Sequence, residues 1–203
     1  MSSHHIVRDA QEPALAILDT HCDVSLIKNL LEWSPTVIVT SDLVDFVIEE
    51  GFKIDVVIGD NEEMSDCMVK LQHQEPVKFL SKNASDNSLQ QLIYFLTAGK
   101  YKAVNILASI NPNLLESIMS FVMAIDVVIY DNGFKWYFCK AKTFKKWVSK
   151  GAAFRTLKAL EISMDGTPII LSKSQTEYSC NCPEEGFITI ATNKDGFWLG
   201  EAI

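Results

Sequence analysis

The clearest chemistry in the sequence lies in the segment IDVVIGDNEEMSD, residues 54–66, where an apolar run stops at Gly59 and acids follow. Asp60 and Glu62 are close enough in sequence to face one hard cation such as Mg²⁺, which prefers oxygen ligands and retains bound water. The alternative is that acids ahead of a helix only interact with the positive end of its dipole. Both interpretations place these carboxylates at the carboxyl end of a strand.

A second polar segment, SKNASDN at residues 81–87, follows the short apolar run VKFL at 77–80. Ser85 or Asp86 would make a good helix cap, because either side chain can accept a hydrogen bond from a free amide of the first turn. VKFL is a possible strand, which would bring Asp86 to the same sheet edge as Asp60. The sequence therefore leaves two roles open for Asp86, a helix cap and a chemical group beside Asp60.

The remaining motifs are weaker. Cys180-Asn181-Cys182 lacks the second ligand pair that a structural zinc site needs. His21 is the one histidine that follows an expected strand. The sequence has no phosphate-binding glycine loop, no nucleophile elbow and no dinucleotide-binding glycine fingerprint. Its five scattered cysteines fit reduced thiols better than a disulfide framework.

The elements that must position these residues alternate from residue 14 to residue 131. Short apolar runs predict strands at 14–18, 36–39, 55–58, 103–107 and 127–130. Segments that can form amphipathic helices lie between or after them, at 25–33, 43–50, 65–72, 85–97 and 112–124. This alternation predicts an α/β domain over residues 1–132, with a mainly parallel sheet covered by helices on both faces.

The pattern changes after Asn132. Short strand candidates lie at 134–138, 155–163, 168–172, 187–193 and 196–203, and turn signals such as Asp165-Gly166 divide them. The segment TFKKWVS at 143–149 is the one stretch here that we expect to form a helical turn. Residues 133–203 are therefore predicted to form a small all-β domain.

Composition excludes several classes of function. The 203 residues carry 18 lysines and arginines against 26 acids, a net charge of −8, which argues against nonspecific binding to nucleic acid or to an anionic membrane surface. No apolar run approaches the roughly 20 residues that span a bilayer. The first residues resemble no signal peptide, so we expect a cytoplasmic protein.

Taken together, the order of these segments resembles the thiamine pyrophosphokinase family, from about residue 14 to residue 203. IDVVIGDNEE is similar to the family's P-D-x-x-I-G-D-x-D-S, with Asp60 at the first aspartate and Glu62 at the second. KNASDN falls on D-Q-D-x-T-D, with Asp86 at the final aspartate, Ser85 at the threonine and Asn83 where an acid is usual. GTPIIL at 166–171 falls on G-L-K-Y-P-L, and SCN at 179–181 falls on T-S-N.

The resemblance implies a fold and a reaction. The fold would be a three-layer α/β/α Rossmann-like nucleotide-binding domain over residues 1–132 and a thiamine-binding β-sandwich or flattened barrel over 133–203. The reaction would transfer pyrophosphate from ATP to thiamine, giving thiamine diphosphate and AMP. The family's members are homodimers with active sites formed between subunits, so a homodimer is implied here as well.

Site residues follow from the same resemblance. It implies Asp60 and Asp86 as catalytic residues, and Asp60, Glu62 and Asp86 as the ligands of Mg²⁺. The residues implied to contact ATP or thiamine are Asp42, Asn83, Ser85, Cys180 and Asn181.

Several positions depart from the family's motifs. Its D-G-G-A-N loop falls on residues 41–45, so that Ser41 stands at the aspartate and Asp42 comes one place late. Its G-G-R-x-D-H segment falls on 111–116, so that Asn113 replaces the arginine and Leu115 the aspartate. Ile169 replaces an aromatic ring on the thiamine side. These losses keep open an alternative, a catalytically inactive homologue that acts as a nucleotide- or thiamine-binding or regulatory dimer.

Overall fold

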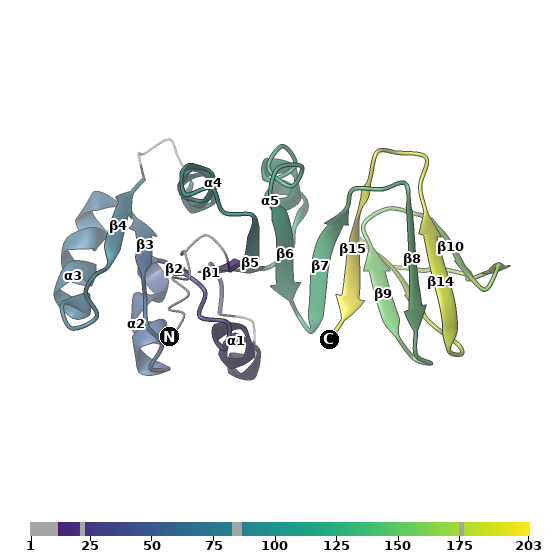
Figure 1. Cartoon of the computed structure of the whole chain (residues 1–203), viewed down its shortest axis with the longest axis horizontal. Coiled ribbons are helices and arrows are strands. Elements are labelled where there is room, and N and C mark those ends of the chain that lie inside the picture. The colour runs from purple at the N-terminus through teal and green to yellow at the C-terminus, as the bar shows by residue number, and fades with distance from the viewer. Residues whose placement is uncertain (1–11, 21–22, 83–86, 175–176) are drawn as a thin grey trace, which may run out of the picture. The chain divides into compact units, whose positions relative to one another are not determined.

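The computed structural model describes residues 12–20, 23–82, 87–174 and 177–203. The chain divides into two compact units, Met1–Val127 and Val128–Ile203. A parallel sheet lies in the first unit and antiparallel strands lie in the second, which confirms the prediction of a mixed α/β chain at that level (Figure 1). Among the described residues, none of the helices has both the length and the apolar character that crossing a membrane requires.

The first unit is built on five parallel strands in the order β5-β1-β2-β3-β4. All four residues of β1, β2 and β3 are buried, as expected for strands that are covered on both faces. The possible strand at 77–80 is confirmed with its bounds shifted by one residue, since residues 78–81 form β4, which lies at the edge of this sheet. The strands are β1 (Ala14–Ile17), β2 (Val37–Thr40), β3 (Val56–Gly59), β4 (Lys78–Ser81) and β5 (Ala103–Leu107).

Helices connect these strands, and in Figure 1 α1 and α2 lie on one side of the sheet while α4 lies on the other. The buried residues of α4 are Leu89, Leu92 and Leu96, which repeat at helical spacing. The helices are α1 (Val24–Leu31), α2 (Val44–Glu49), α3 (Asn61–Leu71), α4 (Ser88–Ala98) and α5 (Pro112–Ser117), and a short 3₁₀ turn, η1 (Ser41–Leu43), follows β2.

Helix α5 ends earlier than its sequence pattern predicts. The apolar spacing predicted a helix to residue 124, but the helix ends at Ser117 and turns follow. In these turns Met119 N donates to Glu116 O, and Phe121 N donates to Ile118 O. These are bonds to the third residue back, which belong to a tighter turn than the α-helix, and they alternate with bonds to the fourth residue back, from Val122 N to Ile118 O and from Ile125 N to Phe121 O. Apolar residues at such spacing can be buried by an α-helix or by a series of turns, so the sequence pattern could not determine where the helix ends.

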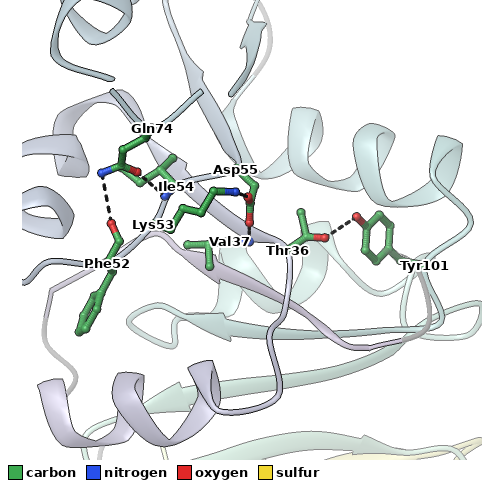
Figure 2. Close-up of polar contacts among 8 residues, drawn as sticks. All are labelled: Thr36, Val37, Phe52, Lys53, Ile54, Asp55, Gln74 and Tyr101. Carbon is green, nitrogen blue, oxygen red and sulfur yellow. Dashed lines mark hydrogen bonds and ion pairs between the residues drawn. The ribbon is translucent and has the colours of Figure 1, made fainter. Parts of the chain in front are cut away.

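The amino ends of the parallel strands are tied together by side chains (Figure 2). Val37 N donates to Asp55 Oδ2 at 2.9 Å, and the same carboxylate pairs with Lys53. Ile54 N donates to Gln74 Oε1 at 2.8 Å. These polar groups therefore satisfy one another and fix the entry into β2 and β3.

The second unit consists of strands that pair antiparallel in two sheets. One sheet has the order β12-β13-β9-β15-β7-β6, and the other has the order β11-β10-β14-β8. The strands are β6 (Asp126–Asp131, which begins at the end of the first unit), β7 (Phe134–Cys139), β8 (Thr143–Val148), β9 (Ala153–Thr156), β10 (Glu161–Met164), β11 (Thr167–Pro168), β12 (Ser172–Lys173), β13 (Tyr178–Asn181), β14 (Gly186–Ala191) and β15 (Phe197–Ala202).

The core of the second unit draws on both of its sheets. Phe154 and Leu199 come from one sheet, Ile188 and Ile190 come from the other, and all four are nearly fully buried. The unit therefore has an apolar core of its own, which is what an independent domain needs.

Three element predictions in this unit were wrong. The segment at 168–172 was expected to form one strand, but β11 ends at Pro168, β12 begins at Ser172, and residues 169–171 between them are not in a strand. The segment at 143–149 was expected to form a helical turn, but residues 143–148 form β8, whose six residues pair with β14 from Gly186 to Ala191. The segment at 155–163 was expected to form one strand, but a turn divides it into the end of β9 and the start of β10. A hydrogen bond of 2.8 Å from Thr156 Oγ1 to Lys158 O holds that turn.

Candidate functional site

Asp60 lies at the carboxyl edge of the parallel sheet, directly after β3, and is the N-cap residue of α3. Its carbonyl oxygen accepts hydrogen bonds from Glu63 N and Met64 N, both at 3.1 Å. Its carboxylate makes no capping hydrogen bond to the described first turn of α3. Instead, Asp60 Oδ2 lies 3.2 Å from Lys82 Nζ. The backbone of Asp60 thus begins the helix, while its side chain forms an ion pair.

Lys82 is placed beside Asp60 by the sheet. Gly59 and Ser81 are the last paired residues of β3 and β4, and Lys82 N donates to Gly59 O at 2.9 Å. The side chain of Lys82 is 25% exposed and that of Asp60 is 49% exposed. Lys82 was not predicted as a site residue, although a residue that directly follows the strand next to β3 is expected at this edge.

A second contact lies above Gly59. Ser41, the first residue after β2, donates its hydroxyl to the carboxylate of Glu63 in the first turn of α3. A Cβ atom on Gly59 would lie 2.1 Å from Ser41 Oγ and 2.5 Å from Ser41 Cβ, so only glycine fits there. Glu63 is therefore a site residue that sequence reasoning missed, because its partner follows a different strand.

The other predicted residues of this edge are not brought together in the described structure. Glu62 is exposed in the first turn of α3, and Asp42 is exposed in η1. Asn83, Ser85 and Asp86 lie outside the described residues, so the Mg²⁺ site on Asp60, Glu62 and Asp86 stays a prediction.

The expected helix cap at Ser85 or Asp86 was wrong. Helix α4 begins at Ser88, and its cap is Asn87, whose side chain accepts a hydrogen bond of 2.8 Å from Gln90 N. Asparagine is as good a cap as serine or aspartate, and the choice among neighbouring cap residues depends on where the helix starts.

The described carboxylates alone do not fit Mg²⁺, which requires several oxygen ligands in octahedral geometry. Asp60 is paired with the ammonium group of Lys82, and the carboxylate of Glu63 accepts a hydrogen bond from the hydroxyl of Ser41. Within residues 12–20, 23–82, 87–174 and 177–203, no three His, Cys, Asp or Glu side chains are arranged to hold a metal ion.

A further polar contact lies where β1 and β5 end. Asp19 follows β1, Ser109 follows β5, and Ser109 Oγ donates to Asp19 Oδ2 at 2.5 Å. The chain leaves β1 toward β2 on one side, and β5 pairs with β1 on the other. Such a switch point is where open α/β sheets bind their ligands. Neither residue was predicted from the sequence, although Asp19 directly follows the expected strand at 14–18 and Ser109 lies two residues after the one at 103–107.

The segment that falls on the family's G-G-R-x-D-H has a structural role here. Asn111 caps α5 through a hydrogen bond of 2.9 Å that its side chain accepts from Leu114 N. Leu115 is only 4% exposed. The position at which the resemblance expects an aspartate is therefore part of the apolar core, and Asn113 beside it is exposed.

Cys180 and Asn181, which the resemblance implies as ligand contacts, lie at the end of β13. Cys180 is buried in the core of the second unit, and burial raises the pKa of its thiol to about 11, so the thiol is neutral at pH 7. Asn181 is exposed. Ile169, at the lost aromatic position, packs against the core, whereas Ile170 is 92% exposed. Ligand contacts of Cys180 and Asn181 stay predictions.

A hollow of about 930 Å³ lies at the opposite edge of the parallel sheet, where β2, β3 and β4 begin. Trp33, Phe52 and Pro76 line it together with Lys53 and Lys78. This hollow lies away from Asp60 and Lys82, so it is a separate feature from the candidate site.

No family model and no curated protein matches the sequence. Solved structures do resemble the fold. Thiamin pyrophosphokinase from yeast aligns with a TM-score of 0.65 and 11% identity over 95% of this chain and 87% of that chain. Thiamin pyrophosphokinase from Candida albicans aligns with a TM-score of 0.62 and 12% identity over 96% of this chain and 90% of that chain. The structure from Geobacillus thermodenitrificans aligns with a TM-score of 0.62 and 11% identity over 94% of this chain and 97% of that chain. The resemblance noted in the sequence is thus confirmed for the fold.

Proposed function

We propose that this chain is a divergent member of the thiamine pyrophosphokinase family that binds ligands without efficient turnover. The ligands are ATP or a related nucleotide, and thiamine or a related small molecule. The first unit supplies the nucleotide-binding, Rossmann-like domain, and the second supplies a thiamine-binding β-sandwich. As in that family, the working unit is a homodimer.

The observation that carries this proposal is the burial of Leu115. At 4% exposure, its side chain contributes to the core and offers neither a negative charge nor a hydrogen-bond acceptor to a ligand. Phosphoryl-type transfer depends on positioning and on charged groups that stabilise developing charge. Losing one preorganised contact of this kind typically lowers a rate on the order of 10²–10³-fold.

The contact of Ser41 supports the same conclusion. Its hydroxyl is packed above Gly59 and donates to Glu63, so this position now joins η1 to α3. Two positions that the resemblance assigns to acids, Ser41 and Leu115, are thus used for packing. Binding needs fewer charged groups than turnover, and an intact sheet edge can still provide it.

Transfer of pyrophosphate from ATP to thiamine is the second candidate function. The position of Asp60 favours it, since this carboxylate follows β3 at the sheet edge where α/β proteins bind ligands. In that case Mg²⁺ would accompany ATP, and Asp86 would complete the ligand set with Asp60 and Glu62.

One assay separates the two candidates. We expect ATP and thiamine each to raise the melting temperature of the wild-type protein, with little or no thiamine diphosphate formed in the presence of ATP, Mg²⁺ and thiamine. If Asp60 binds Mg²⁺, as in the transferase candidate, Asp60→Ala should reduce the shift caused by ATP. Asp66→Ala is the matched control, because Asp66 is an exposed acid on the same helix that pairs with Lys70.

The outcomes differ clearly. Steady formation of thiamine diphosphate and AMP that disappears in Asp60→Ala would establish the transferase and refute the binding-only proposal. Absence of both product and thermal shift would refute both candidates.

A further inference from the structure

We propose that Lys82 takes the place of a divalent metal ion at the carboxyl edge of the parallel sheet. Its ammonium group lies beside Asp60 and supplies the positive charge that such an ion would otherwise provide. Phosphate-bearing ligands then bind there without a divalent metal. This inference rests on the proposed function, in which a nucleotide binds at this edge.

The backbone fixes the position of Lys82. The parallel pair of β3 and β4 ends at Gly59 and Ser81, and Lys82 N donates to Gly59 O at 2.9 Å. Asp60 and Lys82 are therefore the first residues beyond two adjacent hydrogen-bonded strands. Their side chains meet at 3.2 Å because the sheet sets the register, not because two mobile surface groups happen to approach.

Burial also separates this ion pair from an ordinary surface pair. Three-quarters of the Lys82 side chain is covered, since it is 25% exposed, whereas Lys53 in the pair with Asp55 is 60% exposed. Covering the stem of a lysine restricts its rotamers and leaves the charged end in a defined place. The ammonium of Lys82 is thus positioned before any ligand arrives.

Chemistry then decides between the ammonium and a metal ion. An ammonium has three donors, so one can bond Asp60 while the others remain available to phosphate oxygens. Mg²⁺ would need the same carboxylate at roughly 2.0–2.1 Å, where the ammonium of Lys82 would repel it. The carboxylate of Asp60 can therefore bind either Mg²⁺ or the ammonium group of Lys82, and in this structure it binds the ammonium group.

The neighbouring acids that the structure describes do not restore a metal site. Glu63 already accepts the hydroxyl of Ser41. Glu62 is exposed, and both glutamates lie in the first turn of α3, where the positive end of the helix dipole offsets their charge. Among the described residues that directly follow β3 and β4, Lys82 therefore supplies the positive charge.

Binding of inorganic pyrophosphate, measured by calorimetry in EDTA and again in Mg²⁺, tests the role of Lys82. We expect the wild-type protein to bind it with the same affinity in both buffers. Lys82→Met should weaken binding in EDTA by about tenfold, the value of one charge-assisted hydrogen bond. Lys82→Arg should retain most of the affinity, and Lys53→Met, which breaks the comparable pair at the opposite edge, should leave it unchanged.

A second measurement needs no ligand. Electron paramagnetic resonance of Mn²⁺ should show that the wild-type protein leaves the ion free in solution. Mn²⁺ held by the wild-type protein, or pyrophosphate binding that disappears in EDTA, would overturn the role of Lys82. If neither pyrophosphate nor ATP binds in either buffer, the proposed function fails, and the Mn²⁺ result still decides which cation Asp60 takes.

Discussion

At the scale of single residues, Gly59 determines whether the carboxyl edge can form. It has no side chain because Ser41 approaches its backbone closely, and this approach lets the hydroxyl of Ser41 reach Glu63. In the sequence, Gly59 marks only the point where an apolar run stops and acids follow. The reason that only glycine fits is its contact with η1, which no local pattern reveals.

Gly59→Ala should therefore lower the free energy of unfolding by roughly 1–3 kcal/mol, the usual cost of overpacking, as measured by urea denaturation. Ser41→Gly with Gly59→Ala removes the atoms that clash and should recover much of the loss. If Gly59→Ala is as stable as the wild type, the close approach of Ser41 is wrong.

At the scale of elements, β8 shows why one prediction failed. Phe144, Trp147 and Val148 are spaced like one face of a helix, so the segment was read as a helical turn. In the strand, Phe144, Lys146 and Val148 share the inward side, and Lys146 is accepted there because its ammonium bonds Glu201 of β15. That partner is 55 residues away, so the sequence of β8 alone could not reveal it.

The same contact predicts a pH dependence. Burial would raise the pKa of Glu201, but the hydrogen bond from Lys146 and the charge of Lys135 outweigh it, so the pKa lies below its ordinary value of 4.5. Because its pKa is lower in the folded state, the ionised Glu201 stabilises the fold above about pH 4.5, and this stabilisation is lost as the pH falls through the folded-state pKa.

Glu201→Gln should accordingly reduce the free energy of unfolding by roughly 1–2 kcal/mol at pH 7, and the difference from the wild type should shrink below pH 4. Chemical denaturation across pH 3–7 measures it. Glu161→Gln, at an exposed position of β10, serves as the control. A difference that stays constant over this range would contradict the assignment.

At the scale of the whole molecule, the sequence predicted far more of the fold than of the site. Buried parallel strands such as β2 and β3 are recognisable in the sequence as short apolar runs, so each strand of the parallel sheet could be predicted. The contacts of the carboxyl edge join residues that follow different strands, such as Asp60 with Lys82. They depend on sheet order, which a single sequence does not state.

The proposed homodimer gives the whole-molecule prediction. Sedimentation velocity should show a species of twice the 22.8 kDa chain mass at micromolar concentration. Because a dimer dissociates on dilution, the species should shift toward the chain mass as concentration falls. A single species of 22.8 kDa at every concentration would refute the dimer.

The burial of Leu115 also limits what a substitution at this position can add. A single substitution that introduced an acid at this position would bury a carboxylate in the core, at a cost of several kcal/mol. A total stability of about 5–15 kcal/mol leaves little room for that step. Placing a carboxylate at this position would therefore require α5 to be repacked first, so no single substitution at Leu115 is expected to add a charged group to this part of the chain without a large loss of stability.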